Sequence, residues 1–370
     1  MMDNRQYRRI AVYLLSLSGG AGKNATKYAR VLADAGHDVR LICGTGARSS
    51  HQVDLPSTVR RVELGATRHH QVPTKLALAL RNFNPDTLLV IGLSNMLPTT
   101  IAVALLRWRL PIFLRVANSP AALIASYGPI KRMFKRPAFA SALRSADRVI
   151  ALTRAMRTEL ESEWKVPSGK ITLIYNGVPI PETPPIVARR DDPPVLLCVA
   201  RLVPQKDHAT LLRAFALLRA DRPCRLRLAG DGEEKGRLVA LASELGIAAD
   251  VEFLGHVDDV APLYRDATLT VLSSRFEGFP NVLIEALAHG CPVVATDCPT
   301  GPREVIDTSV GLLAKASDYE DLAAKLKTAL VQEFKPNDLL ARAQLFSDAQ
   351  FRLKICKLFD RCSRMATRYA

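Results

Sequence analysis

The sequence predicts an α/β protein made of two doubly wound domains. Three observations lead to this prediction: strand-like segments that are apolar throughout, their regular alternation with helical segments, and a proline-rich break near the middle. Strands of this kind are typical of a parallel sheet that is covered by helices on both faces. A chain of 370 residues with 48% hydrophobic residues has the length and composition of two globular domains.

In the first half of the chain, strand-like and helical segments alternate from the N-terminal end onward. Strands are expected at residues 8–17, 37–43, 85–92, 110–118 and 147–153, with a helix over residues 23–36 that ends at a glycine and further helices in between. Residues 87–106 carry no charge, and about 20 apolar residues could cross a membrane as a helix. Because glycine, serine, asparagine, proline and threonine divide this segment, a buried strand followed by a buried helix is the favoured interpretation.

Residues 176–194 contain six prolines and no apolar period, which predicts a linker. The alternation then resumes, with strands expected at residues 194–202, 224–230, 250–257, 267–274 and 292–296. We therefore expect domains at residues 1–178 and 193–346. The basic amphipathic helix expected in residues 347–370 completes the first domain.

Charge is distributed unevenly between the two halves. Residues 1–180 contain 26 Lys and Arg against 10 Asp and Glu, whereas the other 190 residues contain 25 and 26. This asymmetry predicts an anionic partner for the first domain alone. The seven scattered cysteines never form a C-x-x-C pair, which argues against a disulfide framework or a zinc site and favours reduced thiols in the cytoplasm. The N-terminal apolar run is too short and too early interrupted for a signal peptide.

Three segments carry residues suited to bind a ligand at the carboxyl ends of strands. Gly19 and Gly20 follow the first strand in a turn that could approach a phosphate, although the spacing matches neither a P-loop nor G-x-G-x-x-G. Arg201 and Lys206 follow the first strand of the second domain, where two cations suit a diphosphate. Taken alone, the glycine turn is equally consistent with ordinary loop geometry, and the two cations are equally consistent with solvated side chains.

The third segment is a Gly-Phe-Pro loop, residues 278–280, flanked by Glu277 and Glu285. A helix is expected to begin near Asn281, and within it Asn281, Glu285 and His289 recur every four residues as one polar stripe. The stripe could simply face water. A carboxylate near a helix start could instead accept two sugar hydroxyls.

The segment from Glu277 to Glu285 resembles the E-x7-E motif of retaining glycosyltransferases of family 4. Further segments of that family occur in the same order, namely the Gly19-Gly20 turn, RLVPQKD, LAGDGEE, FLGHVDD and TDCPTGPREVI. The resemblance covers nearly the whole chain. It implies the GT-B fold, in which two Rossmann-like domains face a central cleft and a C-terminal helix returns to the N-terminal domain.

The resemblance also implies a role for each matching residue. Arg201 and Lys206 would hold the nucleotide diphosphate and stabilise it as it leaves, and Glu277 would contact the donor sugar. Glu285 would bind the ribose, and the region of Val257 would face the base. Backbone groups of Gly278, Phe279, Asn281 and Val282, together with Gly19 and Gly20, complete the expected substrate-binding set. No Asp-x-Asp pair occurs, so neither a metal nor another cofactor is expected.

Many members of the family carry a histidine after a middle strand of the N-terminal domain. The corresponding position here is Ala117, and Asn118 or Arg115 could contribute in its place. Other histidines suggest no site. His208 is expected at the surface of a helix start, and His69-His70 lack a third metal ligand nearby.

Residues 127–148 interleave Lys and Arg with Met and Phe. This pattern suits the surface of an anionic membrane, with about 1 kcal/mol for each cation. We therefore expect a cytoplasmic, peripheral enzyme at the inner face of the cell membrane, with no nucleic-acid partner. A basic face without any lipid role is the alternative.

The expected function is transfer of a hexosyl or N-acetylhexosaminyl group, with retention, from a nucleotide-diphosphate sugar. UDP is the expected nucleotide. The acceptor would be a glycolipid, a polyprenyl-diphosphate-linked sugar or another glycan in polysaccharide or lipopolysaccharide biosynthesis. Two alternatives remain open: a nucleotide-sugar epimerase of similar architecture, and a non-catalytic nucleotide-sugar-binding protein at the membrane surface.

Overall fold

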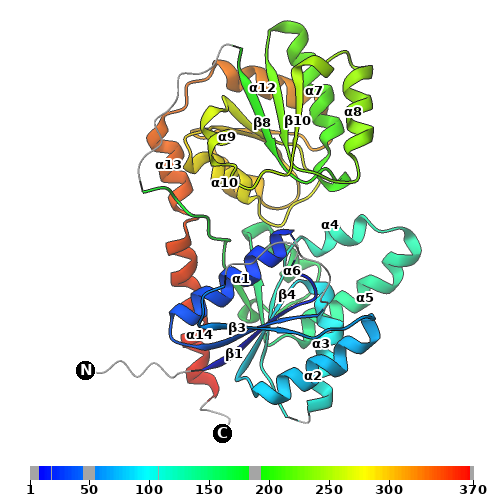
Figure 1. Ribbon diagram of the computed structural model, residues 1–370, viewed down its shortest axis with the longest axis vertical. Helices are drawn as coiled ribbons and strands as arrows, with labels where there is room; N and C mark the ends of the chain where they lie inside the picture. Colours follow the sequence, from blue (N-terminus) through cyan, green and yellow to red (C-terminus); the bar gives the residue numbers. More distant parts are fainter. Residues whose placement is uncertain (1–7, 18, 45–54, 107, 183–192, 367–370) are drawn as a thin grey trace. The chain divides into compact units, whose positions relative to one another are not determined.

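The computed structural model describes residues 8–17, 19–44, 55–106, 108–182 and 193–366, with side chains up to Asp360. The chain forms two compact units (Figure 1). Unit 1 comprises residues 1–175 and 351–370, and unit 2 comprises residues 176–350. The polypeptide therefore leaves unit 1 and returns to it at its C-terminal end.

Unit 1 is built on a parallel sheet of seven strands in the order β3-β2-β1-β4-β5-β6-β7. The strands are β1 (Arg9–Leu14), β2 (Asp38–Cys43), β3 (Val59–Glu63), β4 (Thr87–Ile91), β5 (Ile112–Arg115), β6 (Arg148–Ala151) and β7 (Ile171–Leu173). The helices are α1 (Gly19–Asp34), α2 (Val72–Phe83), α3 (Met96–Leu106), α4 (Pro120–Ala125), α5 (Pro129–Ser145), α6 (Arg154–Ser162) and α14 (Asp348–Ala366), the last of which begins in unit 2.

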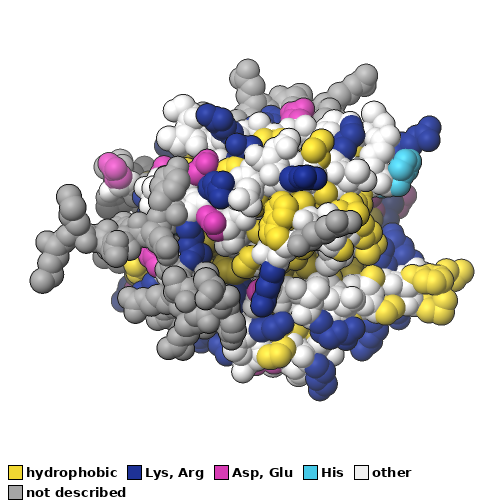
Figure 2. All heavy atoms as spheres, turned by 90° about the horizontal axis from the view of Figure 1, so that it is seen from below, with side chains coloured by type: hydrophobic (Ala, Val, Ile, Leu, Met, Phe, Trp, Pro, Cys, Tyr) yellow, Lys and Arg dark blue, Asp and Glu magenta, His cyan; other side chains and the backbone are white. Residues whose placement is uncertain are grey.

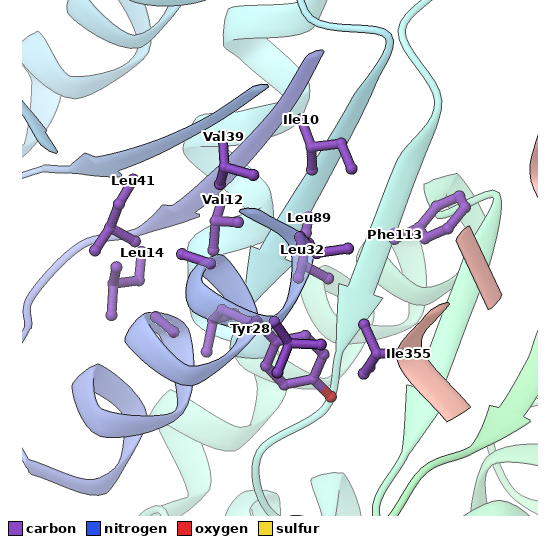
Figure 3. Packing of buried hydrophobic residues seen from close by; sticks show 14 of the residues in the cluster. Ile10, Val12, Leu14, Tyr28, Leu32, Val39, Leu41, Leu89, Phe113 and Ile355 are labelled. Atoms are coloured by element: carbon purple, nitrogen blue, oxygen red, sulfur yellow. The ribbon is translucent and has the colours of Figure 1, made fainter. Parts of the chain in front are cut away.

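The core of unit 1 explains why the C-terminal helix belongs to it. Phe351 of α14 meets the ring of Tyr28 edge-on at 4.9 Å, and Phe359 packs on Phe113 of β5 at 5.1 Å. Ile355, one helical turn from each, is fully buried in the same cluster (Figure 3). Burying an aromatic or aliphatic side chain of this size contributes about 1.5–3 kcal/mol, so α14 is a structural part of the first domain.

Unit 2 repeats the architecture with six parallel strands in the order β10-β9-β8-β11-β12-β13. Its strands are β8 (Val195–Val199), β9 (Arg225–Ala229), β10 (Val251–Gly255), β11 (Leu269–Leu272), β12 (Val293–Thr296) and β13 (Gly311–Ala314). Its helices are α7 (His208–Asp221), α8 (Lys235–Glu244), α9 (Ala261–Asp266), α10 (Asn281–Ala288), α11 (Pro302–Val305), α12 (Tyr319–Val331) and α13 (Pro336–Gln344). The order reverses at β8, so the loops after β8 and β11 are adjacent at a topological switch point.

The predicted class, two doubly wound parallel sheets, is confirmed, but several elements differ from the expectation. Helix α1 starts at Gly19, so Gly19 and Gly20 lie in its first turn and not in a preceding loop. The close approach is made by Gly22, where a Cβ would lie 1.7 Å from the Leu17 carbonyl oxygen. The edge strand β3 was not predicted, because its exposed charged residues hide the apolar pattern.

Helix α3 is not the buried helix that the sequence suggested. Leu97, Ile101 and Leu105 are about half exposed or more and recur every four residues along one side of it. No helix in the described part of the chain is long and apolar enough to span a bilayer.

Candidate functional site

The centre of the candidate site is an ion pair at the switch point of unit 2. The Lys206 Nζ lies 2.5 Å from Glu277 Oε1, and both side chains are largely buried. Ser274 Oγ donates to the same carboxylate oxygen at 2.6 Å. Lys206 follows β8 and Glu277 follows β11, so the adjacency of these two strands brings together residues 71 positions apart.

Only one oxygen of Glu277 is occupied in this way. Its other carboxylate oxygen, Oε2, takes no hydrogen bond from any described residue. Glu277 is 5% exposed, and Oε2 is not one of the fully buried polar atoms that lack a partner, so this oxygen can be reached from solvent. Glu277 is therefore held in place through Oε1 and has Oε2 left for a ligand.

Several hydrogen bonds join the loop after β8 to the loop after β11. The Arg275 amide donates to the Gln205 carbonyl at 2.9 Å, and the Gln205 side chain donates back to the Phe276 carbonyl at 2.8 Å. Ser273 Oγ donates to the carbonyl of Lys206 at 2.9 Å. These bonds fix the backbone on both sides of the ion pair, which preorganises its geometry.

An ionic clamp adds to this connection. Arg275 binds the buried carboxylate of Asp207 through two nitrogens, at 3.0 and 3.3 Å, and Ser317 Oγ donates to the same carboxylate. The hydrogen bond to Asp207 raises the pKa of Arg275. Asp207 has a left-handed backbone (φ 49°), which asparagine and aspartate tolerate better than most residues.

The segment 298–301 supports the Glu277 loop from a third strand. Thr300 Oγ1 donates to the carbonyl of Glu277. Gly301 has φ +102°, and a Cβ there would lie 2.6 Å from Pro280 Cδ. Thr300 and Gly301 belong to the TDCPTGPREVI segment that carried the resemblance, but the sequence did not reveal that they hold Glu277.

Arg201 lies apart from this network. It is exposed in the loop after β8, and its side chain contacts no described partner. The loop itself is fixed by the glycines of the next segment: a Cβ on Gly230 would meet the Ala200 carbonyl oxygen at 2.0 Å, and one on Gly232 that of Leu202 at 2.3 Å. Arg201 is thus an exposed cation on a closely packed backbone, and its guanidinium is available to an anion.

The start of α10 supplies backbone donors. The N–H groups of Gly278 and Val282 make no hydrogen bond to a described residue, whereas that of Asn281 is taken by the Phe279 carbonyl at 3.1 Å. Phe279 turns away and packs on Phe346 at 5.5 Å. Asn281 Oδ1 accepts a hydrogen bond of 3.0 Å from Asn176, a residue of the linker segment that the sequence did not single out.

Glu285 lies apart from Glu277 in its contacts. Its Oε2 accepts a hydrogen bond of 3.0 Å from the hydroxyl of Tyr264, a residue that no sequence pattern indicated. Val257, the expected neighbour of the base, is half-buried in the loop after β10. The structure thus joins Lys206 and Glu277 directly. Arg201 lies earlier in the same loop as Lys206, Val257 lies in the loop after β10, and Glu285 lies within α10.

The candidates of unit 1 form no comparable cluster. Asn118 is half-buried in the loop after β5, whereas Arg115 at the end of that strand is buried against Tyr28, 5.9 Å from its ring. Burial lowers the pKa of Arg115 and raises that of Tyr28 to about 12. The neighbouring carboxylate of Glu159 is fully engaged by Ser119, the Ala121 N–H and the Trp164 indole.

His208 contradicts its expected place at the surface. It is fully buried at the start of α7, and neither ring nitrogen has a hydrogen-bond partner among the described residues. Burial, reinforced by the charge of Lys206, lowers its pKa to about 4. Within the described residues, no group of three or more His, Cys, Asp or Glu side chains is arranged to hold a metal ion.

Comparison with known families accounts for both units. Residues 18–181 match the model of Glycosyltransferase Family 4, and residues 179–345 match that of Glycosyl transferases group 1. The chain belongs to this glycosyltransferase family.

One curated relative illustrates the similarity of this chain to other members of the family. The chain is 32% identical over 190 residues to the N-acetylgalactosamine-N,N'-diacetylbacillosaminyl-diphospho-undecaprenol 4-alpha-N-acetylgalactosaminyltransferase of Campylobacter jejuni. That match covers 50% of this chain and about half, 51%, of the relative.

Two solved structures show the same fold at 20% identity. Sucrose-phosphate synthase from Thermosynechococcus elongatus has a TM-score of 0.82 and covers 97% of this chain and 100% of its own. Anabaena HepE in complex with UDP and glucose has a TM-score of 0.77, with 96% and 99% covered. The GT-B fold that the sequence predicted is confirmed.

Proposed function

We propose that the protein is a retaining glycosyltransferase that moves a hexosyl or N-acetylhexosaminyl group from a nucleotide-diphosphate sugar, with UDP as the nucleotide. The observation that carries this proposal is the buried Lys206–Glu277 pair, in which Glu277 Oε2 is left without a partner. The motif that supplied the resemblance thus coincides with a preorganised ionic site at the switch point of a parallel sheet.

The chemistry of the transfer assigns a role to each charge. As the bond between the anomeric carbon and the diphosphate breaks, its electron pair passes to the phosphate oxygen. Lys206 and Arg201 stabilise the charge that develops there, and this kind of preorganised electrostatic stabilisation is the largest contribution in many enzymes. Glu277 accepts hydrogen bonds from the donor sugar through Oε2. The acceptor hydroxyl attacks the face from which the diphosphate leaves and passes its proton to the departing phosphate oxygen, so the configuration is retained.

Two relatives support the proposed donor and acceptor classes. Anabaena HepE was solved with UDP and glucose, and the Campylobacter relative is named for transfer to a diphospho-undecaprenol-linked sugar. We therefore infer a glycolipid, polyprenyl-diphosphate-linked or other glycan acceptor in cell-surface polysaccharide or lipopolysaccharide assembly. With Arg201, Lys206 and the amides near Gly278 serving the diphosphate, the reaction is proposed to need no metal.

The test is release of nucleoside diphosphate from a panel of UDP- and GDP-sugars, with and without lipid-linked and soluble glycan acceptors. We expect acceptor-dependent release that persists in EDTA, and an axial or equatorial product linkage that matches the donor anomer by NMR. Inverted product would overturn retention, and loss of activity in EDTA that Mg²⁺ restores would overturn metal independence.

Two other classes of function give different results in the same assay. An epimerase would convert one nucleotide sugar into another without an acceptor, and a binding protein would give a thermal shift with no product. Neither outcome is favoured, because residues 115–120 contain no carboxylate or histidine for an epimerase, and Lys206 and Glu277 are both intact.

The outer face of unit 1 supports association with an anionic membrane. In α5, Lys131, Arg132 and Arg136 are exposed among Ile130, Met133 and Phe134, whose exposed fractions are 75%, 64% and 66%. The helix contains no acidic residue. Figure 2 shows exposed yellow hydrophobic side chains bordered by dark-blue Lys and Arg side chains in the right half of the view. Cations beside bulky apolar groups suit an anionic interface.

Flotation with liposomes tests this part of the proposal. We expect the protein to bind vesicles of phosphatidylglycerol and phosphatidylcholine in 50 mM salt and to dissociate as salt rises, because screening weakens the attraction. Replacing Lys131, Arg132, Lys135 and Arg136 by serine should abolish binding, and replacing Lys325 and Lys327 on α12 should not. Equal binding by both variants would contradict the assignment of this face.

A further inference from the structure

Tyr264 is hydrogen-bonded to Glu285 but is not part of the E-x7-E motif. Tyr264 lies on α9, 21 residues before Glu285, and is 1% exposed. Its hydroxyl hydrogen donates to Glu285 Oε2 at 3.0 Å, whereas Oε1 accepts no hydrogen bond from the described residues. The carboxylate is therefore held at one oxygen and open at the other.

The phenol ring is itself fixed by its surroundings. It stacks on the imidazole of His289 with the ring centres 5.7 Å apart and the planes 24° apart. His289 Nδ1 lies 2.8 Å from the main-chain carbonyl of Glu285. Because a carbonyl oxygen only accepts, Nδ1 carries a hydrogen, and this bond ties the imidazole to the same helical turn as the carboxylate.

The hydroxyl of Tyr264 remains a donor over the whole working range of pH. Burial, followed by the charge of Glu285, raises its pKa well above the usual value. The hydrogen bond from Tyr264 restricts rotation of the Glu285 carboxylate. If the carboxylate turned away, the buried hydroxyl would lose its acceptor, which costs about 1–3 kcal/mol.

We propose that Tyr264 is a positioning residue that directs Glu285 Oε1 toward the ribose hydroxyls of the nucleotide and so makes binding depend on those hydroxyls. This inference rests on the proposed function, in which Glu285 contacts the ribose. A carboxylate oriented in advance forms its bonds to the ribose without a further loss of side-chain freedom, and a freely turning one does not. The residue contacts the carboxylate and not the nucleotide.

The test compares UDP with 2′-deoxy-UDP, and GDP with 2′-deoxy-GDP, by calorimetric titration of the full chain. We expect the wild type to bind the ribonucleotide of one pair at least 10-fold more tightly than its deoxy analogue. Tyr264→Phe, which keeps the ring, should reduce that ratio to 3-fold or less by weakening the ribonucleotide alone. Glu285→Gln should reduce the ratio similarly, and the double variant should lose no more than either single variant.

Tyr13→Phe is the matched control. Tyr13 is equally buried, and its hydroxyl has no hydrogen-bond partner among the described residues, so this variant should keep the wild-type ratio. A wild-type ratio in Tyr264→Phe would overturn the positioning role while leaving the proposed function intact. If the wild type binds none of the four nucleotides, the proposed function itself fails, and the inference with it.

Discussion

Both units contain carboxylates whose positions are fixed by hydrogen bonds, but their oxygens are occupied to different extents. In unit 1, both oxygens of Glu159 are occupied by neutral donors of Ser119, Ala121 and Trp164. In unit 2, Glu277 and Glu285 are each held at one oxygen and open at the other. A fully engaged carboxylate stabilises a loop, whereas one held at a single oxygen is positioned and still able to bind a ligand.

The positively charged side chains are also arranged differently in the two units. Lys206 is buried against Glu277, and Arg201 is exposed earlier in the same loop, which close contacts with glycines hold in place. The excess cations of unit 1 are instead dispersed over exposed helices such as α5. We infer that charge serves a small anionic ligand in unit 2 and an extended anionic surface in unit 1.

Lys206→Ala is expected to have the largest effect on activity. It removes a charge that stabilises the leaving diphosphate, and loss of one such donor typically lowers turnover by about 10²–10³-fold. Steady-state release of nucleoside diphosphate measures the effect. The matched control is Lys327→Ala, since Lys327 forms an exposed ion pair with Asp221 in the same unit. Wild-type turnover in Lys206→Ala would remove Lys206 from the mechanism.

Glu159→Ala should separate the structural carboxylate from the binding ones. It leaves three donors without their acceptor: the Ser119 hydroxyl before α4, the Ala121 N–H in its first turn and the Trp164 indole after α6. Each buried unsatisfied donor costs about 1–3 kcal/mol. We expect urea unfolding to show a loss of about 3 kcal/mol with nucleotide affinity unchanged. If nucleotide affinity falls while stability is kept, Glu159 belongs to a binding site and the contrast between the units is wrong.

The buried His208 predicts a loss of stability in acid. Its pKa is about 4 in the folded protein against 6.5 when exposed, so below pH 6.5 the unfolded chain binds a proton that the folded chain does not. The contribution is complete above about pH 7 and falls as the pH decreases toward 4, by about 2 kcal/mol between pH 7.5 and 5. His208→Leu should lose correspondingly less stability over that interval in urea unfolding. An identical pH dependence in both proteins would show that His208 is not buried as a neutral group.

The sequence predicted much of this architecture and part of the site, for a physical reason. Apolar strands buried on both faces and glycine-ended helices leave a periodic pattern, so the alternation in both units was foreseeable. The sequence also placed Lys206 and Glu277 after strands of the second domain, where a ligand is expected, but it did not predict the ion pair between them.

Contacts that depend on tertiary packing left no such pattern. Tyr264 lies in an ordinary amphipathic segment, and only the folded chain places its hydroxyl against Glu285. His208 looked like a surface residue because it follows two charged residues, but the start of α7 is buried. The assignment of Gly19 and Gly20 to a turn was wrong because the first turn of α1 tolerates glycine as readily as a loop does.

The central claim is that the ionic loops of unit 2, and not the basic face of unit 1, bind the nucleotide. The most direct measurement is calorimetric titration of UDP, with GDP in parallel, into three proteins: the wild type, Lys206→Ala, and the α5 variant with serine at residues 131, 132, 135 and 136. We predict that Lys206→Ala weakens the preferred nucleotide at least 10-fold and that the α5 variant binds it as the wild type does. Nucleotide affinity that is lost in the α5 variant and kept in Lys206→Ala would contradict the account.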